Sequence, residues 1–122
     1  MDKVIAAYFV GKPDSFEIFK AVYEQVRSLG SFDVTVRSQI SFGVKRKFAW
    51  FWLYNVTRKN PNGILHMMLR VDRKIGDPHI RNIEQIGKNR WNHQVVVRTL
   101  GDAQSKWLHQ LLKGAYEFGS SP

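Results

Sequence analysis

The sequence predicts a two-layer α+β domain, in which two main helices pack on one face of a mostly antiparallel sheet of four to five strands. Three observations predict it. Apolar residues have helical spacing near both ends of the chain, they alternate with polar residues in the middle, and turn residues separate the alternating segments. The 122 residues suit one hydrophobic core, so we expect a single domain over residues 1–122.

Two helical segments are expected before the sheet. Residues 1–13 form a short N-terminal helix or arm that ends at Gly11-Lys12-Pro13. A longer helix follows, and Asp14 is placed to cap it. Its apolar residues recur every three or four positions as far as Gly30, which predicts an inner face that contains Phe16, Phe19, Tyr23 and Val26.

The middle of the chain predicts the strands. Residues 32–44 alternate between apolar and polar, as one strand or as two strands broken near Ser38. Residues 48–54 are apolar throughout, which is typical of a central strand. The turn signal at residues 60–63 precedes a strand over 64–71, so these two strands form a hairpin.

The last third of the chain returns to a helix. A short element at residues 80–86 has no clear period, and its type stays open, whereas residues 91–100 predict the last strand. Gly101-Asp102 then begins the second main helix, whose apolar stripe contains Leu108, Leu111, Leu112 and Ala115. Residues 119–122 are expected to fray.

This arrangement leaves one face of the sheet without helices. The segment 48–54 must place large side chains on that face: either Trp50, Trp52 and Tyr54, or Ala49, Phe51 and Leu53. An exposed apolar patch of this kind usually marks an interaction surface. We take as candidates for this aromatic face Trp50, Phe51 and Trp52.

The net charge of +9 is concentrated in the predicted sheet. Residues 1–36 carry a net charge of −1, residues 37–98 carry +10 and residues 99–122 carry 0. Basic residues at strand ends commonly protect sheet edges. They also neutralise phosphates in proteins that bind single-stranded nucleic acids. The candidates for contact with an anionic partner are Arg37, Lys45, Arg46, Arg70 and Arg98.

Several chemistries are excluded or unsupported. The chain has no cysteine, so a disulfide, a thiol nucleophile and a cysteine zinc site are excluded. The longest apolar run, residues 4–10, is too short to span a membrane, and no signal peptide is apparent, so we expect a cytoplasmic protein with no membrane partner. Asp77, His79 and His93 match no metal-ligand spacing. We therefore expect no catalytic residues, no metal and no cofactor, and we expect a binding role.

Several short motifs occur along the chain in a fixed order: Gly11-Lys12-Pro13, residues 38–42, Phe48-Ala49-Trp50, Trp91-Asn92-His93, Asp102, Trp107-Leu108 and Ala115-Tyr116. Together they resemble the domain-of-unknown-function 5655 family, and this resemblance implies a small cytoplasmic bacterial or archaeal domain without an assigned activity. Relatives often have a second histidine after His93, where this chain has Gln94. The resemblance directs attention to Ser38, Arg46 and His93.

Three functions compete at this point. The first is a non-enzymatic interaction module whose basic, aromatic sheet face binds its own copy as a homodimer. The second is a protein that binds single-stranded nucleic acid through the same face. The third is a small-molecule sensor or enzyme with a polar pocket at Ser38 and His93.

Overall fold

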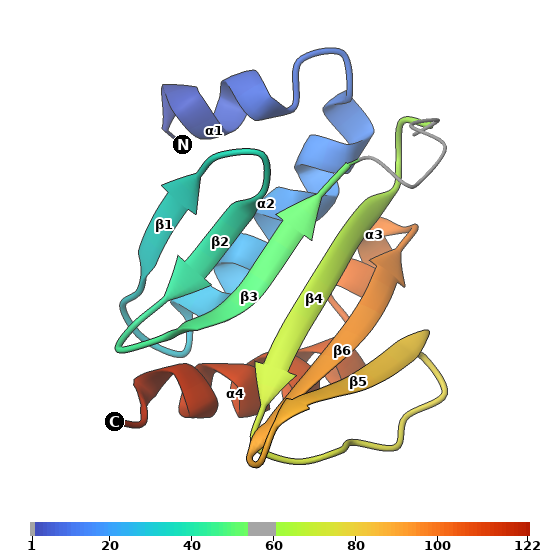
Figure 1. Cartoon of the computed structure of the whole chain (residues 1–122). Coiled ribbons are helices and arrows are strands. Elements are labelled where there is room, and N and C mark those ends of the chain that lie inside the picture. Colours follow the sequence, from blue (N-terminus) through green and yellow to red (C-terminus); the bar gives the residue numbers. More distant parts are fainter. Residues whose placement is uncertain (1, 54–60) are drawn as a thin grey trace.

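The computed structural model describes residues 2–53 and 61–122, which form four helices and one antiparallel sheet of six strands (Figure 1). The sheet order is β1-β2-β3-β4-β6-β5. The helices are α1 (Lys3–Tyr8), α2 (Pro13–Arg27), α3 (Leu100–Ala103) and α4 (Lys106–Ser120). The strands are β1 (Asp33–Val36), β2 (Ile40–Gly43), β3 (Lys47–Trp52), β4 (Leu65–Val71), β5 (Asn82–Gly87) and β6 (Arg90–Val97).

The α+β class and the antiparallel sheet are confirmed, but four to five strands is wrong. The segment from Phe32 to Val44 contains both β1 and β2, which pair antiparallel around a turn at residues 37–39. The element at 80–86 is the edge strand β5, which pairs with β6. Most of β5 is exposed, so it has no alternating pattern for sequence analysis to detect.

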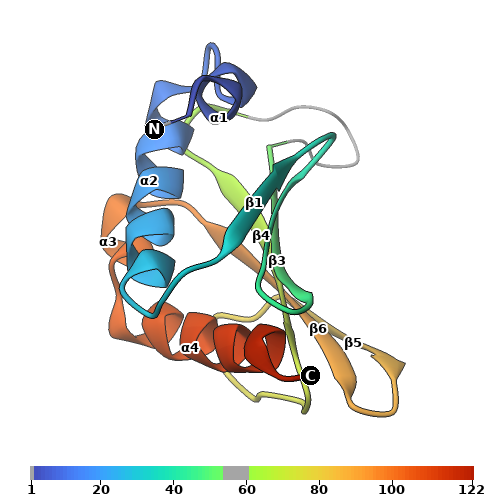
Figure 2. The same cartoon turned by 90° about the vertical axis from the view of Figure 1, so that its left-hand side faces the viewer.

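Helices α2 and α4 lie on one face of the sheet, and the other face has no helix over it (Figure 2). The covered face holds the core. From α2 it receives Phe19 and Val22, and from α4 it receives Leu108 and Leu112, all four fully buried. Phe19 meets Phe51 of β3 edge to face, with ring centroids 5.4 Å apart.

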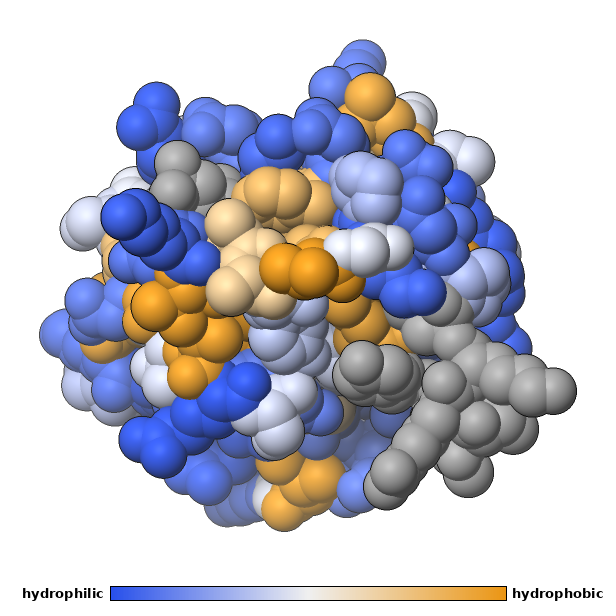
Figure 3. Space-filling view, turned by 90° about the horizontal axis from the view of Figure 1, so that it is seen from above, coloured by the Kyte–Doolittle hydropathy of each residue, from blue (hydrophilic) through white to orange (hydrophobic). Residues whose placement is uncertain are grey.

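Helix α1 covers one end of the sheet. Ile5 and Phe9 are buried there, and the Phe9 ring stacks on Phe16 of α2 with the centroids 5.1 Å apart. Gly11 ends this segment with a φ of 78°, a conformation that suits glycine. The outer side keeps apolar groups exposed, since Val4 is 58% and Val10 is 79% exposed. Figure 3 views this end and shows apolar side chains gathered within hydrophilic surroundings.

The C-terminal segment departs from expectation at both ends. The helix expected from Gly101 onward is two helices, because Thr99 caps α3 and Ser105 caps α4. Helix α4 then continues through Ser120, past the start of the expected frayed tail at 119. The carbonyl oxygen of Gly119 accepts hydrogen bonds from the backbone N–H groups of Lys45 and Arg46, which ties the helix end to the β2–β3 turn.

Candidate functional site

The helix-free face of the sheet, called the open face below, presents one continuous cross-strand row of side chains. A polar residue stands at either side of a central pair, Trp50 and Met68. Ser41 is only 4% exposed beside Trp50, so this part of the face is closely packed. The strand register places in this row Thr35, Ser41, Trp50, Met68, Gln94 and Asn82.

Arg70 occupies the next position on β4 and leans over Trp50. Its guanidinium carbon is 4.4 Å from the centroid of the Trp50 ring, within cation–π range. Its Nε donates a 2.9 Å hydrogen bond to Oδ1 of Asn92 on β6. Burial, followed by the nearby charge of Arg90, lowers the pKa of Arg70 below its ordinary range. The arginine is thus oriented by two partners, neither of which neutralises its charge.

A second aromatic pair lies beside the first. Trp52 of β3 pairs across the strands with His66 of β4, and the two rings stack at 12° with centroids 5.9 Å apart. Burial lowers the pKa of His66 from 6.5, and the charges of Arg98 and Arg81 lower it further. His66 is therefore mainly neutral at pH 7 and stacks as an aromatic ring.

Arginines surround these rings. The charges of Arg81 and Arg98 lower the pKa of His66, and the charge of Arg90 lowers the pKa of Arg70, so each of these arginines lies near the open face. Among the described residues, none of these four arginines forms an ion pair with a carboxylate. The only acidic residue that the register of the described strands places beside them is Glu84, opposite Asn92. The face combines flat aromatic surfaces with unneutralised positive charge.

The family model described as Domain of unknown function (DUF5655) matches residues 5–119 of this chain. The chain belongs to this family. Neither a search of curated proteins nor a search of solved structures finds a match. The family match covers all six described strands of the sheet, so the open face lies within the family's own domain and is not an addition to it.

In this member of the family, the open face brings together four of the predicted site residues: Trp50, Trp52, Arg70 and Arg98. Phe51 points the other way and is fully buried against Phe19 and Phe42, so its place among the exposed aromatics was wrong. Side chains alternate along a strand, and the helices cover the Phe51 side. Tyr54, the third candidate of the same phase as Trp50, lies outside the described residues.

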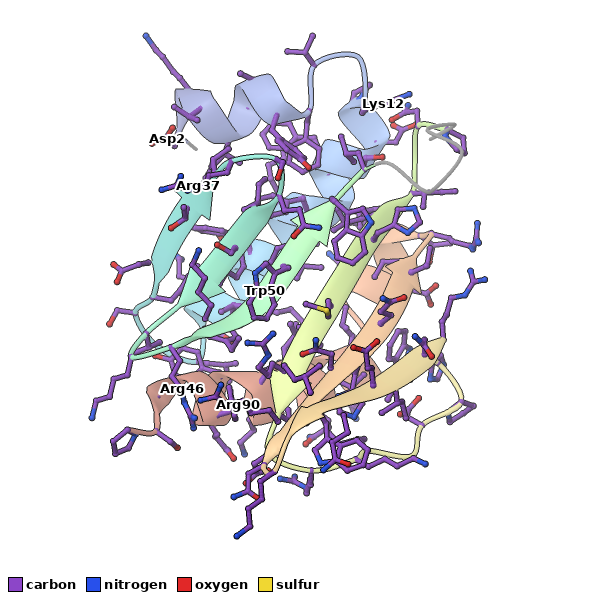
Figure 4. All side chains as sticks on the ribbon, in the orientation of Figure 1. Asp2, Lys12, Arg37, Arg46, Trp50 and Arg90 are labelled. Carbon is purple, nitrogen blue, oxygen red and sulfur yellow. The ribbon has the colours of Figure 1, made fainter. Side chains whose placement is uncertain are left out.

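The other predicted cations lie at the ends of strands (Figure 4). Arg37 is exposed in the β1–β2 turn near α1. Lys45 and Arg46 lie in the β2–β3 turn, where their backbone N–H groups bind the end of α4. Arg46 also donates from Nε to the carbonyl oxygen of Phe118 at 3.3 Å. These residues flank the open face and do not line it.

The polar pocket expected at Ser38 and His93 is not formed. Ser38 is exposed in the β1–β2 turn, whereas His93 is on β6, and strands β3 and β4 lie between that hairpin and β6. His93 is 1% exposed, its Nε2 accepts a 3.0 Å hydrogen bond from the Ile75 N–H, and its Nδ1 lies 3.2 Å from the Trp91 carbonyl oxygen. Both ring nitrogens therefore form hydrogen bonds with backbone groups, which is the structural role that buried histidines commonly have.

Among the described residues, Asp77, His79 and His93 do not come together as a set of three metal ligands. His79 contacts Asp77, with Nδ1 2.8 Å from the carboxylate, and its ring stacks on Trp107. No group of three potential metal ligands occurs in the described part of the chain. In residues 2–53 and 61–122, no helix has both the length and the apolar character needed to cross a membrane.

Sequence analysis missed four contributors to the open face, namely His66, Met68, Arg81 and Arg90. For His66 and Met68 a signal existed, because they alternate with the buried Leu65, Met67 and Leu69 along β4. For Arg81 and Arg90 the sequence contained no such signal. Both flank the poorly patterned strand β5, and only its pairing with β6 brings them to this face.

Proposed function

We propose that this protein is a non-enzymatic, cytoplasmic binding module whose open face binds single-stranded nucleic acid. The observation that carries the proposal is the pairing of each open-face tryptophan with a second planar group: Arg70 over Trp50 and His66 beside Trp52. Proteins that bind single strands stack bases on aromatic rings and on guanidinium planes, and neutralise phosphates with nearby cations.

The spacing of the rings supports this chemistry. Trp50 and Trp52 are two positions apart on β3, so both project from the same face, about 6.6 Å apart along the strand. The Arg70 guanidinium lies over Trp50 and the neutral His66 imidazole stacks beside Trp52, and both of these groups also have flat faces. The face therefore offers two adjacent platforms for consecutive bases.

The charges favour a polyanion over a second copy of the chain. In a twofold symmetric dimer through this face, each copy would present the same patch to the other. Arg70, Arg81, Arg90 and Arg98 would then face like charges, with Glu84 as the acidic residue beside them. Like-charge contacts oppose association, whereas phosphates would neutralise these groups.

The test is a titration of fluorescein-labelled oligo(dT) and oligo(rU), followed by anisotropy between about 50 mM and about 200 mM salt. We expect binding that weakens steeply with salt. Arg98→Gln should reduce the salt slope by about 1, because it removes one phosphate contact. Lys113→Gln removes one positive charge from the exposed side of α4 and serves as the matched control, with no change expected.

The stacking contribution needs its own variant. Trp52→Leu keeps an apolar side chain but removes the ring, so we expect binding to weaken by about 1–3 kcal/mol. Circular dichroism and a melting curve establish that the variant is folded. The proposal fails if neither oligonucleotide binds at low salt, or if Arg98→Gln and Lys113→Gln have equal effects.

A further inference from the structure

A separate basic cavity lies at the end of the molecule where α4, the β5–β6 turn and the chain after β4 meet. Its volume is about 820 Å³, within the range of small-molecule sites. Its charged lining residues are Arg46, Arg73, Lys88, Arg90, Asp72 and Glu117. Figure 4 shows Arg46 and Arg90 near one another at this end, below Trp50.

Arg46 is held in place by groups that do not neutralise it. Its guanidinium carbon is 3.9 Å from the centroid of the Phe118 ring, and its Nε donates to the Phe118 carbonyl oxygen. Its backbone N–H donates to the Gly119 carbonyl oxygen at 3.1 Å. Because Nε is occupied, the two terminal amino groups form the end of the fork that a ligand oxygen can reach.

The charge balance of the cavity is positive. Asp72 pairs with Arg73 at 3.0 Å, which neutralises that arginine in part. Within residues 2–53 and 61–122, Arg46, Lys88 and Arg90 form no ion pair. The cations Arg46, Lys88 and Arg90 thus line the same cavity, Arg46 from the β2–β3 turn and the other two from the β5–β6 hairpin.

We propose that this cavity binds a phosphate monoester group. A dianion with three terminal oxygens can accept from the Arg46 fork and from Lys88 and Arg90 together, whereas a monocarboxylate would leave donors unused. A free phosphorylated small molecule and the phosphorylated end of a nucleic-acid strand both present this group. The site does not depend on binding at the open face, although Arg90 lies between the two.

The experiment measures binding of inorganic phosphate and of a nucleoside 5′-monophosphate by calorimetry, with the unphosphorylated nucleoside as the reference ligand. We expect saturable binding of both phosphate compounds and none of the nucleoside. Arg46→Gln should weaken binding about tenfold or more, which is one broken charge-assisted contact. Lys88→Gln, in an exposed turn, tests the same site without touching the end of α4, and Lys113→Gln is the control.

Two oligonucleotides that differ only in a 5′-phosphate distinguish the two possible ligands, a phosphorylated strand end and a free phosphorylated small molecule. Tighter binding of the phosphorylated strand, lost in Lys88→Gln, identifies a strand end as the ligand. Equal binding of the two strands, with saturable binding of the monophosphate, identifies a free small molecule. The proposal is overturned if neither phosphate compound saturates, or if both glutamine variants bind as the wild type does. Failure of oligonucleotide binding alone counts only against the open face.

Discussion

His93 is a buried polar residue whose hydrogen bonds explain both its position and its titration. Its Nε2 accepts from the Ile75 N–H, so this nitrogen must be unprotonated in the folded protein. Burial lowers the pKa of His93 from 6.5, and hydrogen bonds with the Leu69 and Trp91 backbone offset part of that effect. Protonation would add a buried charge and break the bond to Ile75.

This titration predicts how stability depends on pH. Since the folded-state pKa of His93 is below 6.5, its stabilising contribution is complete above pH 6.5 and is lost as the pH falls from there toward the folded-state pKa. The free energy of unfolding, measured with urea, should decrease as the pH falls through that interval. His93→Gln should have a flatter profile, and it should cost about 1–3 kcal/mol at pH 7.5 if the Ile75 N–H loses its acceptor.

His66 supplies the comparison, because burial, Arg98 and Arg81 lower its pKa in the same direction. His66→Gln should remove only the contribution of His66 to the pH dependence of the free energy of unfolding. The contribution of His93 should remain. An unchanged profile in His93→Gln would mean that this histidine does not titrate as its hydrogen bonds indicate.

Gly119 is required by a close approach between α4 and β3. A Cβ added there would lie 3.0 Å from the Cβ of Phe48 and would collide with its ring. Gly119→Ala should therefore destabilise the fold by about 1–3 kcal/mol in a thermal or urea melt. Gly114→Ala is the matched control, because its Cβ would meet Val71 at an ordinary 3.7 Å. That variant should gain up to about 1 kcal/mol from helix propensity.

At this scale, alternation predicted two sets of residues on β3 but not which set would be exposed. Both phases are apolar, and only the packing of α2 assigned Phe51 to the core and Trp50 and Trp52 to the open face. A bulge opposite Phe42 and Gly43 also brings Phe48 and the adjacent Ala49 both into the core. Alternation alone cannot predict two neighbouring inward residues.

Among the elements, α2 depends on a residue far away in the sequence. The helix begins at Pro13, one residue earlier than the predicted cap at Asp14, and Lys12 at the N-cap makes no side-chain cap. Instead, Oδ1 of Asn62 accepts from the backbone N–H groups of Asp14 and Ser15, at 2.9 and 3.3 Å. Asn62 Nδ2 also donates to the Asp14 carboxylate. The β4 side of the sheet thereby anchors the start of α2.

Loss of this cap should be measurable. Asn62→Ala removes the acceptor for two helix N–H groups, so we expect a loss of about 0.5–2 kcal/mol in the free energy of unfolding. Gln110→Ala, at an exposed position of α4, should change stability by no more than a few tenths. Equal values for the two variants would show that the Asn62 contact contributes nothing to stability.

The elements that sequence analysis found are those with an apolar face against the core. Helix α2, helix α4 and strand β4 have buried residues at regular spacing, and β3 has buried apolar residues along most of its length. Strand β5 lacked such a signal because its residues are mostly exposed, and pairing with β6 is what makes it a strand. Tertiary pairing, and not local pattern, decides such edge strands.

For the whole molecule, part of the +10 of residues 37–98 gathers in two places. One share surrounds the open face as Arg70, Arg81 and Arg98, and another lines the basic cavity as Arg46 and Lys88. The sequence predicted the segment and several of these residues. It could not predict the division, because the turn that carries Arg46 reaches the cavity only through its bonds to the end of α4.

The balance between charge and apolar surface on the open face predicts the oligomeric state. At low salt the arginines should keep two copies apart, so sedimentation velocity should give a monomer. Added salt weakens this repulsion, with a screening length of about 10 Å at 0.1 M, so any association through Trp50, Trp52 and Met68 should increase with salt. Replacing Arg70 and Arg98 with glutamine together should have the same effect at low salt, while Lys113→Gln should have none. A wild-type dimer that is already complete at low salt, and that the Arg70/Arg98 variant leaves unchanged, would mean that charge does not govern this face. In that case self-association would be the better account of the half-buried tryptophans, because a partner surface would cover the part of each ring that is still accessible.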